Sequence, residues 1–164
     1  MVSLIVLLYV SCRSYKQKDV RAGDVSVTCP EGWKNKFKNL GGAYSLSIQT
    51  VKGNSSGLAQ ITWVPLEADL EVWLDDYQTR MEASPVFGGD KMEFSEKQEG
   101  NFGSYRTTFQ SFKSKVMGLA FEGEVHVFYY GEKSFLIVKQ GAVEDRLANS
   151  KGFKLIEQTF KVTG

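Results

Sequence analysis

Hydrophobic and polar residues alternate along most of the chain after residue 24. Val25, Val27 and Cys29, for example, are separated by Ser26 and Thr28. A period of two predicts β-strands that bury one face, because successive side chains of an extended chain point in opposite directions. Turn sequences rich in glycine, asparagine and serine divide the pattern into segments. The predicted strands span residues 25–29, 44–49, 58–64, 104–112, 119–130 and 134–140, with an edge strand over 91–98.

A helical period replaces this pattern once in the middle of the chain. Asp69 suits a helix N-cap, because its carboxylate can accept hydrogen bonds from the first free N–H groups. Ser84-Pro85 ends the helix, since the residue before a proline avoids helical conformation. The spacing predicts an amphipathic helix whose apolar stripe is formed by Leu70, Trp73, Leu74, Tyr77 and Met81.

A second helix is predicted at the C-terminus from the spacing of Phe153, Ile156 and Phe160. Gly152 is expected to separate it from a shorter helical turn around residues 144–149. Tight turns between sequential strands join only antiparallel neighbours, and two amphipathic helices must bury their stripes on the resulting sheet. The sequence therefore predicts the α+β class, with an antiparallel sheet and two packed helices in one domain over residues 25–164.

The predicted domain opens with the turn Pro30-x-Gly32-Trp33, and a helix of the Leu-x-x-Trp-Leu type follows in mid-chain. A meander with glycine loops and a terminal helix closing on Thr159-Phe160-Lys161-Val162 complete the pattern. Together these features resemble the PsbP/DcrB-like family over roughly residues 25–162. The resemblance implies an antiparallel sheet sandwiched by helices. Members are often exported lipoproteins or accessory subunits of larger assemblies, and they share no catalytic constellation, so the resemblance assigns no functional residue.

The first twelve residues, MVSLIVLLYVSC, are an apolar run that ends in a small residue and a cysteine. This segment resembles the signal peptide and lipobox of bacterial lipoproteins, with residues 1–11 removed and Cys12 diacylated. It departs from that pattern at Tyr9, where leucine is usual, and in having no Lys or Arg before the apolar run. The alternative is an N-terminal strand or helix with a buried cysteine. The lipobox predicts an exported protein that is lipid-anchored to a cell membrane, periplasmic or surface-facing.

Residues 12–24 are predicted to be a tether, because Val20 is their one large aliphatic residue. A flexible chain of this length spans about 20 Å. With Cys12 acylated, Cys29 has no second cysteine to pair with, and its place at the end of an apolar alternation predicts a buried structural thiol.

Composition and charge exclude several classes of protein. The chain of 164 residues is 42% hydrophobic and 24% charged, which is ordinary for a folded domain and excludes collagen, coiled coil and extended disorder. Its 20 Lys and Arg residues against 19 Asp and Glu residues give a net charge of +1. We therefore expect no nucleic-acid partner, because phosphate binding requires a clustered basic surface.

The sequence lacks the residues that most catalytic, metal-binding and cofactor-binding sites require. His126 is the one histidine, and together with Cys29 it cannot supply the three ligands of a zinc site. No Gly-x-Ser-x-Gly elbow or glycine-rich phosphate loop occurs. The sequence predicts no enzyme, no metal site and no cofactor.

A polar face is the best candidate site that the sequence offers. In the strand 119–130, alternate residues from Leu119 to Tyr129 are expected to face inward, with the glutamates and the histidine between them facing outward. With a turn near residue 116, Arg106 falls opposite His126, Thr108 opposite Glu124 and Gln110 opposite Glu122. This face is either a ligand patch, with the two glutamates as an acid–base pair, or a solvated surface. The candidate interaction face comprises Arg106, Glu122, Glu124, His126, Phe128 and Tyr130.

Three functions remain open. The first is a membrane-anchored, non-enzymatic accessory lipoprotein of the bacterial envelope, which binds membrane lipid through acylated Cys12 and an unidentified envelope protein through its sheet face. The second is a lipoprotein carrier or sensor with a pocket for a small apolar ligand, suggested by the 13% aromatic content. The third is a hydrolase that uses Glu122 and Glu124.

Overall fold

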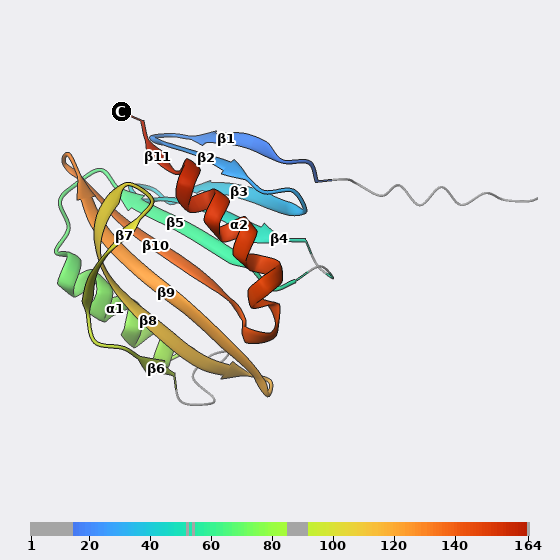
Figure 1. Cartoon of the computed structure of the whole chain (residues 1–164). Coiled ribbons are helices and arrows are strands. Elements are labelled where there is room, and N and C mark those ends of the chain that lie inside the picture. The colour runs from blue at the N-terminus through green and yellow to red at the C-terminus, as the bar shows by residue number, and fades with distance from the viewer. Residues whose placement is uncertain (1–14, 52, 54, 85–91, 164) are drawn as a thin grey trace, which may run out of the picture.

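The computed structural model describes residues 15–51, 53, 55–84 and 92–163. This part of the chain forms two antiparallel sheets and two α-helices (Figure 1). The larger sheet has eight strands in the order β3-β4-β5-β10-β9-β8-β6, with β7 also pairing with β8. The smaller sheet has three strands in the order β1-β2-β11. The predicted α+β class, an antiparallel sheet with packed helices, is confirmed.

The bounds of the elements follow in chain order. They are β1 (Lys18–Ala22), β2 (Val25–Cys29), β3 (Trp33–Asn39), β4 (Tyr44–Thr50), β5 (Leu58–Val64), α1 (Leu70–Glu82), β6 (Glu93–Phe94), β7 (Gln98–Phe102), β8 (Tyr105–Val116), β9 (Leu119–Tyr130), β10 (Lys133–Ala142), the 3-10 turn η1 (Val143–Asp145), α2 (Arg146–Thr159) and β11 (Lys161–Val162).

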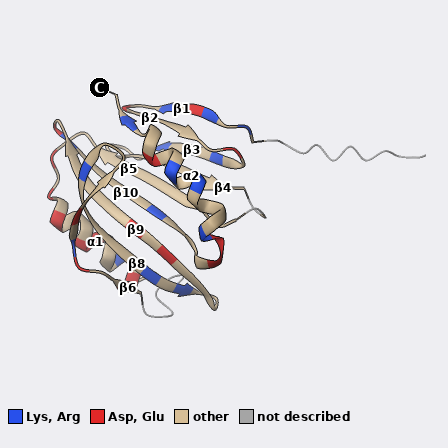
Figure 2. Cartoon of the chain, in the orientation of Figure 1, with Lys and Arg blue, Asp and Glu red and all other residues tan. Residues whose placement is uncertain are grey.

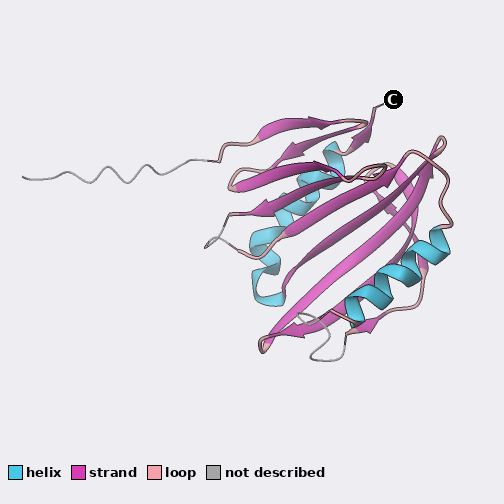
Figure 3. Ribbon diagram, turned by 180° about the vertical axis from the view of Figure 1, so that it is seen from behind, coloured by secondary structure: helices cyan, strands magenta, loops and turns pink. Residues whose placement is uncertain are grey.

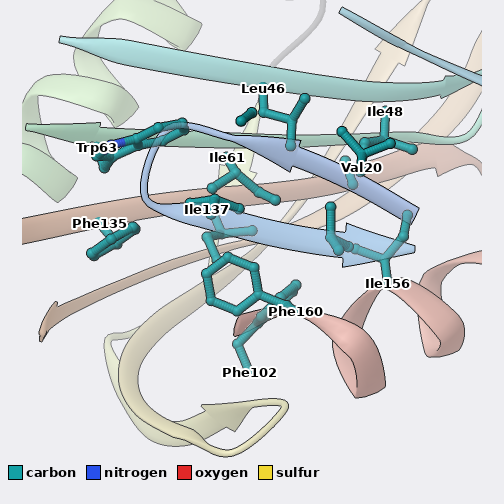
Figure 4. Packing of buried hydrophobic residues seen from close by; sticks show 14 of the residues in the cluster. Val20, Leu46, Ile48, Ile61, Trp63, Phe102, Phe135, Ile137, Ile156 and Phe160 are labelled. Atoms are coloured by element: carbon teal, nitrogen blue, oxygen red, sulfur yellow. The ribbon is translucent and has the colours of Figure 1, made fainter. Parts of the chain in front are cut away.

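The large sheet packs against other elements on both faces. One face packs against α2 and the small sheet around a core that includes Val27 of β2, Trp63 of β5 and Ile156 of α2 (Figure 4). The other face packs against α1, whose buried Leu74 contacts a second cluster that includes Val127 of β9. The described members of the two clusters lie between Val20 and Val162.

The alternation of apolar and polar residues predicted for β4 and β5 is confirmed. It determines which side chains lie on each face of that half of the sheet. Leu46, Ile48 and Ile61 are fully buried in the first core. Ser47 and Gln60, which pair across the two strands, belong to the opposite face. Burial of the apolar face stabilises the hairpin, whereas its polar face requires no cover.

The expected division of β9 into a buried and a solvated face is wrong. Val125 and Val127 are buried beneath α1, as predicted, but His126 and Phe128 on the other face are buried too. The reason is that both faces of β9 are covered. α1 lies over Val125 and Val127, whereas Phe102 of β7 packs against His126 and Phe160 packs against Phe128 on the other face.

The tether predicted over residues 12–24 is wrong from Lys18 onward. β1 pairs with β2 along its whole length and buries Val20 and Ala22. The Asp19 carboxylate accepts a 2.7 Å hydrogen bond from the Thr28 hydroxyl and fixes the register of this pair. Val20 and Ala22 are its two inward apolar residues, and an alternation of only two positions is too short to predict a strand.

The edge of the large sheet also differs in detail from the prediction. The edge strand expected over 91–98 is two short strands, β6 and β7, which pair with successive parts of β8. At the other edge, β3 continues directly from the Pro30–Trp33 turn and was not predicted.

The C-terminal helix α2 is continuous through Gly152, so the predicted break at this residue is wrong. A Cβ atom at position 152 would lie 2.5 Å from Trp33 Cζ2. Gly152 is thus required by close packing of the helix on β3, rather than by a turn.

Cys12 and the predicted signal segment 1–11 lie outside the described residues. Among the helices of the described residues, none has the length and apolar character needed to span a membrane. Cys29 is fully buried, as predicted, and burial raises the pKa of its thiol despite the nearby positive charge of Lys18.

Candidate functional site

The register of β8 and β9 separates the residues of the predicted interaction face. Met117 and Gly118 form the turn, with φ values of 51° and 83°, and Val116 pairs with Leu119. The residue opposite His126 is Phe109, not Arg106 as predicted. A shift by an odd number of positions turns every β8 side chain to the other face. Arg106 therefore lies away from His126.

Arg106 is exposed at the surface and pairs with Glu99 of β7 at 3.1 Å. Phe128 is buried in the first core, stacked on Phe135 with 5.0 Å between ring centroids. Tyr130 remains exposed. The predicted interaction face is therefore not one surface: Arg106 lies on the other face of the sheet, and Phe128 is part of the core.

His126 is the centre of a buried hydrogen-bonded chain. Its Nδ1 lies 3.0 Å from the Thr107 hydroxyl, and its Nε2 lies 3.3 Å from a carboxylate oxygen of Glu124. The order hydroxyl, imidazole, carboxylate is that of a nucleophile relay. Thr107 and His126, however, are only 2% and 4% exposed, and the rings of Phe102 and Phe109 pack against the imidazole. Because no substrate can reach this hydroxyl, the chain serves to satisfy buried polar groups.

Glu122 and Glu124 are both held by cations. Arg146 of α2 donates to both carboxylate oxygens of Glu122. Lys139 lies 2.9 Å from Glu124 and also pairs with Glu157 of α2. The hydrogen bond from His126, followed by that from Lys139, lowers the pKa of Glu124 to about 2. A carboxyl group with this pKa is ionised at neutral pH and cannot serve as a general acid there.

These ion pairs line a hollow of about 860 Å³ between α2 and the sheet, here named the charged cleft. Burial alone would lower the pKa of Lys139, but its bonds to Glu157 and Glu124 outweigh burial and raise it. Acidic and basic side chains are equally numerous in the cleft; they are Glu93, Lys113, Glu122, Glu124, Lys139, Arg146, Lys154 and Glu157. Since most of these charges are paired between sheet and helix, the cleft holds α2 in place.

A second hollow, of about 820 Å³, lies on the opposite face of the sheet, here named the α1 groove. α1 packs over β8, β9 and β10 but leaves the same face of β3, β4 and β5 uncovered (Figure 3). The groove runs between the helix and this open face. Its large apolar lining residues are Leu40, Leu58, Val64, Leu66, Val72, Trp73, Met81, Leu136 and Val138.

The floor of the α1 groove is polar along its middle. Ser45, Gln60, Thr62 and Gln140 line it, and Gln60 donates a 3.4 Å hydrogen bond to Ser45. The helix contributes apolar side chains, of which Val72 is 61% exposed, and the charged Asp76 and Arg80, which pair with each other at 2.9 Å. Apolar walls with a few polar groups on the floor are the usual makeup of a site for an amphipathic small molecule.

Three lysines of β3 extend this open face to the edge of the sheet; we name Lys34, Lys36 and Lys38 the lysine row. They pair with Gln49, Ser47 and Ser45 of β4, respectively, and so lie on the same face as the groove floor. All three are exposed, and none has an ion-pair partner within 4 Å in the described part of the chain. Lysines on an edge strand also prevent pairing with another chain.

Neither the α1 groove nor the lysine row was predicted. Alternating lysines at 34, 36 and 38 were a signal for an outward-facing edge strand, but the residues between them, Asn35 and Phe37, do not form a clear apolar face. The groove is formed by the distance between a helix and strands that are far apart in the sequence. The described residues contain no cluster of three or more His, Cys, Asp or Glu side chains that could hold a metal ion.

No protein-family model matches the sequence, and no curated protein is similar to it in sequence. Solved structures are similar in fold. LpqN of Mycobacterium tuberculosis, described as involved in cell envelope biogenesis, is 12% identical over 91% of both chains, with a TM-score of 0.54. The cyanobacterial PsbP protein CyanoP of Synechocystis is 12% identical over 90% of this chain and 93% of its own, with a TM-score of 0.59.

A protein of Bacteroides thetaiotaomicron is 10% identical over 91% of this chain and 48% of its own, with a TM-score of 0.59. At these identities the similarity concerns the fold alone. The PsbP-like fold suggested by the sequence is confirmed.

Proposed function

We propose that this chain is a non-catalytic binding protein of the bacterial cell envelope, anchored by lipid at Cys12, whose α1 groove holds the apolar chain of an amphipathic ligand. The observation that carries the proposal is the groove itself. A hollow of about 820 Å³ with apolar walls along a helix is large enough for a small-molecule ligand.

The groove favours a carrier or sensor over an accessory protein that acts through the predicted interaction face. That face would require Phe128 and His126 at the surface, and both are buried. Glu122 and Glu124 are paired with cations of α2 and β10. The α1 groove, in contrast, has exposed apolar lining residues, among them Leu66 and Val72.

A hydrolase is the least supported of the three functions. Glu124 is ionised at neutral pH because its pKa is about 2, and Glu122 is bound by Arg146. An acid–base pair needs one carboxyl group that can give up a proton near the working pH. The geometry therefore supports binding rather than turnover.

The charge beside the groove indicates the chemistry of the ligand's polar end. Lys36 and Lys38 pair with Ser47 and Ser45 across β3 and β4, and Ser45 lines the groove. Cross-strand neighbours lie about 4.5–5.5 Å apart, so an anionic head group on the groove floor comes within reach of these ammonium groups. The ligand we propose has an apolar chain along Val72, Leu136 and Val138, and an anionic head toward the lysine row.

Two observations support a place in the envelope. The apolar run before Ser11 and Cys12 has the form of a lipobox. LpqN, which has the same fold, is described as involved in cell envelope biogenesis. The anchor has a direct test: lipid labelling of Cys12 in cells should be lost in Cys12→Ala, and an unmodified first methionine in the native protein would contradict anchoring.

Titration with a fluorescent long-chain fatty acid tests the groove. Residues 15–164 should bind the probe saturably, and Val72→Glu should weaken binding by at least about tenfold, because the carboxylate enters the apolar wall. Leu147→Glu, at an exposed position of α2 far from the groove, is the matched control and should leave binding of the probe unchanged. Lys36→Glu with Lys38→Glu should weaken binding of the fatty acid more than binding of its methyl ester. Absence of saturable binding, or equal effects of Val72→Glu and Leu147→Glu, would overturn the proposal.

A further inference from the structure

We propose that one end of the large sheet is a lipid-contacting surface that docks the domain against the bilayer. It is named the Tyr15 end here, and its exposed apolar residues are Met117, Leu119, Val143 and Leu147. The inference rests on the proposed anchoring at Cys12. It goes beyond that anchoring by assigning the side of the protein that touches the lipid and the residues that enter the membrane interface.

Strand register identifies the elements that meet at the Tyr15 end. Trp33 at the start of β3 pairs with Thr50 at the end of β4. Leu58 at the start of β5 pairs with Gln140 near the end of β10, and Ala142 pairs with Phe121 near the start of β9. The β8–β9 hairpin extends beyond this point to its turn, as Figure 1 shows.

The N-terminal segment joins the domain at this same end. The Tyr15 carbonyl accepts a 2.8 Å hydrogen bond from Gly32 N, and the Gly32 carbonyl accepts a 3.1 Å bond from Val51 N. Tyr15 is thereby fixed next to the first residue of β3 and the last residues of β4. A group attached a few residues before Tyr15 must lie close to the Tyr15 end.

Exposed apolar side chains gather at the Tyr15 end. Met117 is 98% exposed at the hairpin turn, and Leu147 is 87% exposed in the first turn of α2. Leu119 and Val143 are exposed beside them. Met117 also has a φ of 51°, a left-handed conformation that glycine or asparagine adopts at lower cost. Neither the backbone nor internal packing explains a methionine here, whereas insertion into a membrane interface does.

Positive charge accompanies these apolar residues. Lys113 and Lys115 lie on β8 just before the turn, visible as blue positions toward the end of that strand in Figure 2. Both are exposed, and neither has an ion-pair partner within 4 Å among the described residues. Two acidic residues precede α2: Asp145 accepts a 2.9 Å hydrogen bond from Ser56 N, and Glu144 is exposed. Apolar side chains flanked by lysines suit a surface of anionic lipid.

The length of chain before Tyr15 brings this surface to the membrane. Only residues 13 and 14 separate Cys12 from Tyr15. Three peptide units span at most about 11 Å. This is shorter than the span of about 20 Å expected if the whole of residues 12–24 were a flexible tether. An acylated Cys12 therefore holds the Tyr15 end, and not the opposite end, against the lipid. The α1 groove then runs away from the membrane, with Leu58 and Gln140 at its near end.

Site-specific fluorescence tests the orientation. Residues 15–164, preceded by a hexahistidine tag in place of the anchor, are bound to vesicles of phosphatidylcholine and phosphatidylglycerol that contain a nickel-chelating lipid. An environment-sensitive dye is attached to Met117→Cys or, as the matched control, to Glu132→Cys at the exposed turn of the opposite end. The buried Cys29 should not compete for the dye.

The fluorescence emission of the dye at position 117 should move to shorter wavelength and be quenched by a spin-labelled lipid. The emission of the dye at position 132 should show neither change. Leu147→Asp should reduce the shift at position 117, because it removes a second apolar contact. Equal responses at the two positions, or no response at position 117, would overturn the orientation. Self-association of the protein without a lipid-dependent shift would overturn it as well. Because the tag replaces the anchor, none of these outcomes depends on whether Cys12 is acylated in cells.

Discussion

The ionised carboxylate of Glu124, on β9, is held by Lys139 of β10, which also pairs with a residue of α2. His126 Nε2 and Lys139 Nζ lie 3.3 Å and 2.9 Å from its oxygen, and Lys139 also contacts Glu157 of α2. These partners exist only in the folded protein. The low pKa of Glu124 is therefore a property of the fold, and it links the stability of the α2 packing to pH.

The free energy of unfolding should depend on pH through Glu124. Its pKa is about 2 when folded against an ordinary value of 4.5, so the unfolded state binds more protons between these values. The stabilisation is fully present above pH 4.5 and is lost as the pH falls toward 2. Urea unfolding over this range should show a smaller loss of stability for Glu124→Gln than for the wild type. The control Glu99→Gln, at an exposed ion pair, should parallel the wild type, and parallel curves for Glu124→Gln would contradict this role.

Among the elements, α2 depends most directly on one small residue. Gly152 allows the helix to approach β3 so closely that the Trp33 ring occupies the place of a side chain. Trp33 in turn packs edge-on against Phe153, with ring centroids 5.4 Å apart. The helix is thus held on the sheet by aromatic packing at its middle and by ion pairs on its side.

Gly152→Ala should destabilise the protein, although alanine favours a helix. The added methyl group overlaps Trp33 Cζ2, and such overpacking costs about 1–3 kcal/mol. Equilibrium unfolding in urea measures the change, with Lys151→Ala at the neighbouring exposed position as the control. A Gly152→Ala variant as stable as that control, or more stable, would show that the helix does not need this close approach.

The elements differ in how well the sequence predicts them, for physical reasons. β4 and β5 were predicted because apolar residues alternate with Ser, Gln and Thr along the middle of each strand, and α1 because its stripe continues from Leu70 to Met81. β1 was missed because its inward face has only Val20 and Ala22. β3 was missed because an edge strand keeps its lysines in water and shows little hydrophobic contrast.

The candidate site was less predictable than the fold. The position of one turn, at Met117 and Gly118, decides which β8 residues share a face with His126. An error of an odd number of residues reverses that assignment, and the local sequence contains no signal strong enough to prevent it. The α1 groove depends on which strands α1 leaves uncovered, which is a tertiary property.

At the scale of the whole molecule, the small sheet closes the first core, and β1 is part of it. Starting the chain at Val25 should therefore destabilise the protein, by about 2–4 kcal/mol, because burial of Val20 and Ala22 and the β1–β2 pairing are lost. Starting it at Tyr15 should preserve stability. Thermal unfolding of the two forms compares them, and equal midpoints would restore the interpretation of residues 15–24 as a tether.

The two faces of the large sheet differ in how completely they are covered. The face under α2 and the small sheet is closed by packing and ion pairs, and the charged cleft belongs to that closure. The face under α1 is covered over only part of its width and leaves the groove beside the lysine row. We therefore propose that binding occurs on the α1 side of the sheet.

The most direct test is an NMR measurement on residues 15–164 with a long-chain fatty acid. Intermolecular nuclear Overhauser effects should connect the ligand's methylene protons to the methyl groups of Val72, Leu136 and Val138. The amide signals of Lys36 and Lys38 should shift with the carboxylate form of the ligand. Overhauser effects to residues of the charged cleft alone, or none at saturating ligand, would contradict the assignment of the α1 groove as the binding site.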